Sequence, residues 1–215
     1  MFKRLMLILF AMSSAQLFPA LASSEAPLSA RTCDYDLSSF LKQDFETFDQ
    51  SQNGWRKISA LKGCEEAAAN LIGEYRSHHG FHVGKMKLSD ENREYTSAST
   101  LFFHEAQLRA EIGQISLAKD YFRLSMHESF GDWNLYVKAT LAFLEKDRRE
   151  LKRLRNKLST LPVPQDFTYI DADGKRKSGK PDWWPANLKI LDSFLRCFEK
   201  SYAEAYHNEK CYTAQ

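Results

Sequence analysis

Three histidines lie close together in the segment "HHGFH": His78, His79 and His82. Imidazole nitrogens are common zinc ligands, and residues four apart on a helix share one face, as His78 and His82 would. Gly80 lies between these two, however, and glycine commonly ends a helix. We therefore expect a polar helix end here. The alternative is an envelope enzyme, or an accessory subunit of one, with a metal site near residues 78–82.

Two further segments begin like metal motifs and then depart from them. "FHEAQ" places His104 beside Glu105, but Leu108 stands where a zinc-protease helix has its second histidine, so we expect a partly exposed helix surface. "DADGK", residues 171–175, starts like a calcium loop, but Lys175 replaces the third oxygen ligand and a turn is expected. No nucleophile motif or phosphate loop appears either. The sequence therefore predicts a non-catalytic protein without cofactor or metal.

The strongest local charge lies in "RRELKRLRNK", residues 148–157, which has six cations and one acid. Leu151, Leu154 and Leu158 recur at helical spacing and form the expected buried seam of this helix. The cations then cover its other faces, and a solvated helix surface is their expected role. The alternative is a protein that binds an anionic surface, such as lipid headgroups, an acidic polymer or an acidic protein, through helix 148–158.

The N-terminal segment is typical of an exported bacterial protein. Lys3 and Arg4 precede an apolar run over residues 5–12, and an A-x-A arrangement follows it. We predict a signal peptide, residues 1–22, cleaved near Ala22, and a periplasmic or secreted mature protein. Its removal takes away two of 30 cations and no acid, which leaves 28 basic and 28 acidic residues. This balance argues against nucleic-acid binding, and no second apolar run is long enough for a transmembrane segment.

Four cysteines remain in the mature chain: Cys33, Cys64, Cys197 and Cys211. An even number in an exported protein predicts two disulfides, with three pairings open. We favour Cys33–Cys64, because two helices that run in opposite directions between them would bring both cysteines to the same end. Cys197–Cys211 is the second predicted pair, since the tail can double back along about ten helical residues, a rise of about 15 Å. The alternative is four buried free thiols.

Apolar residues recur at helical spacing almost everywhere before residue 160 and predict antiparallel helical hairpins joined by short turns. The predicted helices cover residues 36–48, 55–61, 67–75, 100–112, 115–126, 133–145 and 148–159. Residues 85–99 are polar and are expected to form a loop. After Pro162 and Pro164 the pattern changes, and residues 162–185 are expected to form a small hairpin or a long loop. One last helix is predicted over residues 186–206.

Small residues lie at fixed distances from Gly113 in the segment 102–125. Ala106 lies seven residues before the glycine and Ala118 five after it, where small side chains let two helices pack closely. Phe122 and Ser125 follow nine and twelve residues after the glycine. This arrangement resembles the tetratricopeptide repeat, a family of helical hairpins with a period of about 34 residues.

The resemblance covers residues 54–80 and 100–160. It implies an all-α fold for the single domain over residues 23–215, with antiparallel helical hairpins stacked as a short right-handed array and the C-terminal helix packed on it. Because Gly63 and Gly113 are 50 residues apart, about 16 residues are inserted between these two hairpins.

The same resemblance implies a groove lined by the first helix of each hairpin, where a protein or peptide partner binds. The implied partner-binding residues are Lys57, Thr100, Phe103, Gln107, Asn134, Val137 and Leu141. This set lacks the ordered lysines and asparagines with which some relatives hold a terminal carboxylate, so that mode is not expected. The alternative is that the C-terminal helix occupies the groove and leaves a different interface. We therefore expect an exported, non-catalytic scaffold that mediates protein or peptide binding in the cell envelope.

Overall fold

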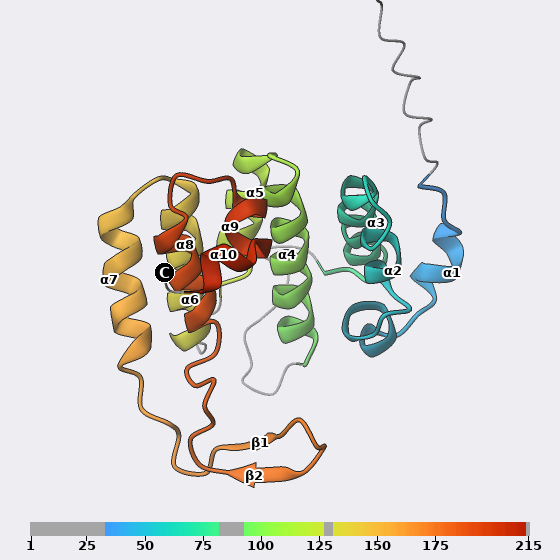
Figure 1. The fold of residues 1–215 in the computed structure, drawn as a ribbon. Helices are drawn as coiled ribbons and strands as arrows, with labels where there is room; N and C mark the ends of the chain where they lie inside the picture. The colour runs from blue at the N-terminus through green and yellow to red at the C-terminus, as the bar shows by residue number, and fades with distance from the viewer. Residues whose placement is uncertain (1–32, 82–92, 127–130, 214–215) are drawn as a thin grey trace, which may run out of the picture. The chain divides into compact units, whose positions relative to one another are not determined.

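The structure is a computed structural model that describes residues 33–81, 93–126 and 131–213 (Figure 1). Within these ranges it contains ten α-helices, one π-helical turn and one sheet of two short strands. The described chain is therefore mostly helical, as the sequence predicts. The predicted signal peptide, residues 1–22, and the third histidine of "HHGFH", His82, lie outside the described residues.

Short helices form the N-terminal part of the fold. They are α1 (Leu37–Leu41), the π-helical turn η1 (Glu46–Gln50), α2 (Trp55–Ser59) and α3 (Glu65–His78). The prediction of one helix over residues 36–48 is wrong, because a new turn begins at Asp44. Its carboxylate accepts a hydrogen bond from the Thr47 backbone N–H at 2.7 Å. Aspartate favours such helix starts, because its side chain satisfies a backbone N–H that has no partner within the helix.

Two longer helical hairpins follow. They consist of α4 (Arg93–Glu111), α5 (Ile115–Leu124), α6 (Gly131–Leu144) and α7 (Arg148–Ser159). The predicted loop over residues 85–99 is wrong from Arg93 onward, where α4 begins. Between α4 and α5 the chain turns at Gly113, whose φ of +79° is a conformation that residues with side chains rarely adopt. α7 has the predicted bounds, and Asp147 caps its start.

The small residues around Gly113 lie where α4 and α5 pack against each other. Ala106 on α4 and Ala118 on α5 are fully buried, as are Phe122 and Ser125. Short, fully buried side chains at these positions are consistent with close packing of the two helices. The Ser125 carbonyl also accepts a hydrogen bond from Trp133 Nε1 at 3.0 Å, which ties the end of α5 to α6.

A β-hairpin lies between α7 and the C-terminal helices. Its strands are β1 (Thr168–Ile170) and β2 (Arg176–Ser178), which pair antiparallel with Tyr169 opposite Lys177. The base of the hairpin is closed by a hydrogen bond from the Gly179 N–H to the Phe167 carbonyl at 3.1 Å. Of the two predicted alternatives for residues 162–185, the structure therefore forms the small hairpin.

Three short helices end the described chain: α8 (Leu188–Arg196), α9 (Tyr202–His207) and α10 (Glu209–Tyr212). The prediction of one helix over residues 186–206 is wrong, because α8 ends at Arg196 and a separate helix begins at Tyr202. The cause is a capping box, in which the Ser201 hydroxyl accepts from the Glu204 N–H and the Glu204 carboxylate accepts from the Ser201 N–H.

Both predicted disulfides are present. Cys33–Cys64 joins the segment before α1 to the start of α3, and Cys197–Cys211 joins the end of α8 to α10. Their Cα–Cα distances of 5.6 and 5.7 Å are ordinary for disulfides. Two disulfides suggest that the protein resides in an oxidising extracellular compartment.

Helix α4 contributes to both clusters of buried apolar side chains. Leu101 and Leu108 belong to the N-terminal cluster, which includes residues of α2 and α3. Phe103 and Ala106 belong to the larger cluster, which extends through α5, α6 and α7 to α8 and α9. α4 therefore links the N-terminal helices to the rest of the described chain.

A charged cluster is buried between α3 and α4. Glu105 is 1% exposed and accepts hydrogen bonds from Arg76 at 2.5 Å and from Arg109 at 3.2 Å. The prediction of a partly exposed helix surface is therefore wrong for Glu105, which is buried because two arginines compensate its charge. Gly73 of α3 faces this carboxylate, and a Cβ at that glycine would lie 3.5 Å from the nearer oxygen.

Candidate functional site

The C-terminal helices, red in Figure 1, pack against the face that the sequence predicts as a groove, with α8 on α6 and α9 on α4. Phe103, Val137 and Leu141 are 4%, 0% and 8% exposed and belong to the core cluster that includes Tyr202 of α9. Gln107 lies beside this contact, and its amide donates to the Tyr202 hydroxyl at 3.5 Å. The C-terminal segment thus packs on two of the helices that would line the predicted groove, and these three apolar residues are buried rather than open to a partner.

The four remaining predicted partner-binding residues lie on three helices. Lys57 is exposed on α2, and Thr100 is half-buried on α4. Gln107 lines a cavity between α2, α4 and α9, whereas Asn134 lines a different groove on α6. The structure therefore does not bring the seven predicted residues together on one open surface.

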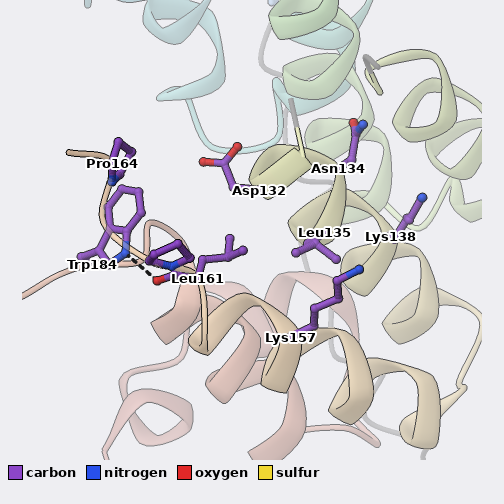
Figure 2. A pocket seen from close by; sticks show the side chains of 9 residues that line it. Asp132, Asn134, Leu135, Lys138, Lys157, Leu161, Pro164 and Trp184 are labelled. Atoms are coloured by element: carbon purple, nitrogen blue, oxygen red, sulfur yellow. Dashed lines mark hydrogen bonds between the residues drawn. The ribbon is translucent and has the colours of Figure 1, made fainter. Parts of the chain in front are cut away.

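A groove with a volume of about 560 Å³ lies at the open end of the α6–α7 hairpin (Figure 2). We call it the α6–α7 groove, and its lining residues are Asp132, Asn134, Leu135, Lys138, Lys157, Leu161, Pro162, Pro164 and Trp184. Figure 2 shows Lys138 and Lys157 on one side of the groove and Trp184 on the other. Leu135 and Leu161 lie between them. The groove thus has an apolar floor with two cations along one edge.

The local sequence explains the wall of the groove that lies beyond α7. Thr160 ends the helix, and Pro162 and Pro164 prevent its continuation, because proline has no N–H and its ring clashes with a helical backbone. The chain returns to this place at Trp184, whose Nε1 donates to the Leu161 carbonyl at 3.2 Å. This hydrogen bond holds the two ends of the β-hairpin segment together and fixes the groove wall.

Positive charge at the groove comes from Lys138 of α6 and Lys157 of α7. Both side chains are exposed, and within the described ranges neither ammonium group forms an ion pair. The carboxylate of Asp132, at the start of α6, accepts a hydrogen bond from the Trp133 backbone N–H at 2.8 Å. An anionic ligand that entered the groove would therefore find two ammonium groups that no carboxylate of the described chain already neutralises.

An aromatic cluster extends from the groove along the β-hairpin. The Phe167 ring lies 4.8 Å from the Trp184 ring, and the Tyr169 ring lies 5.8 Å from the Trp183 ring. Trp183 is 46% exposed, and Ile170 of β1 is 59% exposed. Trp184 therefore connects the groove to an exposed apolar surface on the hairpin.

A second polar site lies around Asp49, which is fully buried. Its Oδ1 accepts hydrogen bonds from Trp55 Nε1 at 3.0 Å and from His104 Nδ1 at 2.8 Å. Burial alone would raise the pKa of Asp49, but the hydrogen bonds from His104 and Trp55 and the charge of Arg56 outweigh it and hold this pKa below its ordinary value. Because an ionised carboxylate only accepts hydrogen bonds, the His104 proton resides on Nδ1.

The two described histidines of "HHGFH" lie at the end of α3 and are exposed. The His79 ring packs 4.2 Å from the Tyr75 ring, and its Nε2 lies 3.0 Å from the Leu41 carbonyl oxygen. Across residues 33–81, 93–126 and 131–213, no three His, Cys, Asp or Glu side chains are arranged to hold a metal ion. In "DADGK", the Asp171 carboxylate accepts from two backbone N–H groups that follow it, as in the predicted turn.

Part of the positive charge in the basic segment 148–157 is compensated by contacts with other residues of the protein. Arg155 forms two hydrogen bonds with Asp192, at 2.7 and 3.2 Å. Arg153 pairs with a glutamate one turn earlier, and Arg148 lies over the Phe198 ring. The three leucines of the predicted seam are buried. The charge that this helix presents to solvent is therefore smaller than its sequence suggests.

The sequence prediction assigned one of the nine groove residues, Asn134, and missed the other eight. Lys157 was treated as part of a solvated helix face, and the leucine and prolines after α7 as the start of a loop. The signal that could have found them is the position of Pro162 and Pro164. They mark where the chain leaves the end of an antiparallel hairpin, and residues from both helices meet there.

Comparisons of the chain with protein-family models, with curated proteins and with solved structures found no match. Within the part of the chain that the structure describes, no helix combines the length and the apolar character that a membrane span requires. The candidate sites are therefore interpreted from their own geometry.

Proposed function

We propose that this protein is an exported, non-catalytic helical scaffold that binds an extended acidic segment of another protein in the α6–α7 groove. The hairpins α2–α3, α4–α5 and α6–α7 would be degenerate tetratricopeptide-like units, stacked as a short array whose inner face is filled by α8 and α9. Support for the array comes from the buried small residues around Gly113. Support for the binding site comes from the two unpaired lysines beside an apolar floor, which is the observation on which the proposal depends.

Charge complementarity selects an acidic occupant. Lys138 and Lys157 would each pair with a carboxylate of the bound segment, because neither has an anionic partner within the described residues. Leu135 and Leu161 would pack against an apolar side chain between those carboxylates. The volume of about 560 Å³ is enough for a few residues in extended conformation.

The groove wall and the adjacent hairpin favour binding in two further ways. The groove wall has little conformational freedom before a partner binds, because of the prolines after α7 and the hydrogen bond from Trp184 to Leu161. Less conformational entropy is therefore lost on binding. Trp183, which is exposed on the hairpin, offers an aromatic side chain of the kind that contributes strongly to protein interfaces.

A selection from a random peptide library, displayed on phage and applied to the immobilised protein, tests this proposal. We expect enrichment of peptides that place acidic residues next to apolar ones. The selected peptides should bind the double variant Lys138→Glu, Lys157→Glu at least about tenfold more weakly, because both favourable charge pairs become repulsive.

The matched control is Lys152→Glu, which reverses an exposed charge on α7 outside the groove. It should leave the affinity for the selected peptides unchanged. Peptides that bind the double variant and the wild type equally well, or a selection that enriches no acidic peptides, would contradict the proposal.

A further inference from the structure

The cavity between α2, α4 and α9, with a volume of about 500 Å³, has a cationic end and an anionic end. At the cationic end, the Arg56 guanidinium lies 4.2 Å from the centre of the Trp55 ring. The same ring lies 5.3 Å from the His104 ring. Arg56 and His104, which both line the cavity, therefore both pack against the Trp55 ring.

The anionic end lies farther along α4. Glu111 follows His104 by seven residues, which places it on the same face of the helix and about 10.5 Å farther along its axis. Gln114, just beyond α4, donates to Glu66 at 2.9 Å, so the start of α3 lies beside the end of α4. Glu65, which lines the cavity from the start of α3, is therefore at the same end as Glu111.

The α9 helix contributes His207 to the anionic end. His207 Nε2 lies 2.9 Å from Glu111 Oε1, so one of the two glutamates already has a partner. Glu65 accepts only a long contact of 3.4 Å from the Gly63 backbone N–H. This end therefore has two carboxylates but only one imidazole partner, so a cationic group of a ligand can pair with the second carboxylate.

The cationic end has a hydrogen-bond donor without a partner. Arg56 Nη1 is buried and makes no hydrogen bond within the described residues. Buried donors are normally paired, so the Arg56 guanidinium lacks part of its hydrogen bonding, and the same side chain lines the cavity wall, where a ligand can approach it. Asp49 holds His104 through Nδ1, which leaves Nε2 of that ring to accept a hydrogen bond from a ligand donor, such as a peptide N–H. Two other buried arginines have an unpaired Nε, but they bind Glu105 through their terminal nitrogens.

We propose that this cavity binds a short peptide of about three residues with free termini. The peptide carboxylate would pair with Arg56, and its ammonium group with Glu65 and Glu111. An extended chain of three residues spans about 10 Å, which matches the separation of the two ends along α4. A ligand with a single charge would leave the charges at the opposite end without a partner in a partly enclosed site.

Gln107 lies midway between the two ends of the cavity. It occupies the face of α4 that carries His104 and Glu111, and it lines the same cavity. Its side-chain amide has both donors and an acceptor, so it can hydrogen-bond to the backbone of a bound peptide, whatever the peptide side chains are. The inference does not depend on the α6–α7 groove, which other residues line.

Calorimetric titration of the mature protein with trialanine, trialanine amide and N-acetyl-trialanine tests this inference. We expect trialanine to bind with one site per chain. Each blocking group should weaken binding at least about tenfold, because it removes one charge-assisted contact. Absence of trialanine binding, or equal binding of the blocked peptides, would overturn the proposal. These measurements use the unaltered protein and do not depend on the folding of a variant.

Variants assign the two ends of the peptide. Arg56→Gln should weaken trialanine binding about tenfold and leave the affinity for trialanine amide unchanged, because the amide no longer uses that end. Glu111→Gln should weaken trialanine binding about tenfold and leave the affinity for N-acetyl-trialanine unchanged, because the acetylated peptide no longer uses the anionic end. Lys57→Gln is the matched control, since Lys57 is exposed next to Arg56 and does not line the cavity. A loss with Lys57→Gln as large as that with Arg56→Gln would also overturn the proposal.

The groove variant Lys138→Glu separates this inference from the proposed function. It should bind trialanine with unchanged affinity, because Lys138 lines the α6–α7 groove and not this cavity. Loss of trialanine binding in Lys138→Glu would place the peptide in the wrong site and overturn the inference.

Discussion

Asp49 connects three helical segments through one carboxylate. It lies in η1, and its oxygen accepts hydrogen bonds from Trp55 of α2 and His104 of α4. The carboxylate is fully buried, so removal of its charge would leave two buried donors without an ionised acceptor. This single side chain therefore affects both the stability of the N-terminal helices and the position of His104 in the cavity wall.

The Asp49→Asn variant should be less stable than the wild type at pH 7 by about 1–3 kcal/mol. It removes a buried negative charge, and its amide nitrogen would replace Oδ2, which now accepts a hydrogen bond from Gln50 Nε2. The pKa of Asp49 in the folded protein lies below its ordinary value. Ionised Asp49 therefore stabilises the fold above pH of about 4, and this contribution is lost as the pH falls through the folded-state pKa. Urea unfolding at several pH values measures the difference.

The control for this pH dependence is Asp166→Asn, which alters an exposed aspartate in the segment after α7. Its free energy of unfolding should differ from that of the wild type by less than about 0.5 kcal/mol at every pH. A stability difference between Asp49→Asn and the wild type that stays constant down to the lowest pH would contradict the assigned role of the ionised carboxylate.

Glu105 is the second buried charge whose removal should be costly. Glu105→Ala leaves Arg76 and Arg109 buried without their carboxylate, and we expect a loss of about 3–5 kcal/mol in the free energy of unfolding. Glu145→Ala removes a carboxylate from an exposed ion pair with Arg123 and should cost less than about 1 kcal/mol. Both losses are measured by chemical denaturation. Equal losses in the two variants would show that the buried cluster contributes no more to the free energy of unfolding than an exposed ion pair does.

At the scale of the elements, the hairpins depend on small side chains at the contact between α4 and α5. Ala118→Leu adds three carbon atoms at a fully buried position and should destabilise the protein by about 1–3 kcal/mol or more. Ser116→Leu makes a comparable change at an exposed position of the same helix and should be nearly neutral. Thermal unfolding of both variants checks this, and similar melting temperatures for the two would contradict close packing at Ala118.

How well the elements could be predicted depended on whether their signals were local. The bounds of α7 were predicted correctly because Asp147 caps its start and three leucines recur at helical spacing, three and then four residues apart. The break between α8 and α9 was missed, because the apolar stripe continues through it at helical spacing. Ser201 and Glu204 carried the local signal for that break, since they have the spacing of a capping box.

The candidate sites could be predicted less well than the helices. Phe103 and Val137 were assigned to an open groove from their positions within the hairpins, but both are buried in a core cluster that includes residues of α8 and α9, more than 50 residues later in the sequence. No local sequence pattern encodes burial against residues that are so distant in the sequence. Glu105 was similarly placed at the surface, because its arginine partner Arg76 lies on a different helix.

At the scale of the whole described molecule, the C-terminal segment is part of the core rather than a separable tail. Phe194 and Tyr202 are almost fully buried, and Cys197–Cys211 holds the segment in place. The double variant Cys197→Ser, Cys211→Ser should lose about 3 kcal/mol in the free energy of unfolding, because the crosslink restricts the unfolded chain. Denaturant unfolding tests this, and a loss below about 1 kcal/mol would indicate that the packing of α8 and α9 alone fixes the segment.

Under the proposed function, partner binding depends on the α6–α7 groove, since α8 packs on α6 and α9 on α4. The most direct test is photo-crosslinking in cells that export the protein, with a photoreactive residue at Pro164 in the groove or at Lys152 on an exposed face of α7. We predict a discrete adduct with another protein from position 164, lost in the Lys138→Glu, Lys157→Glu background, and none from position 152. An adduct from position 164 that survives this charge reversal, or equal adducts from both positions, would contradict the account.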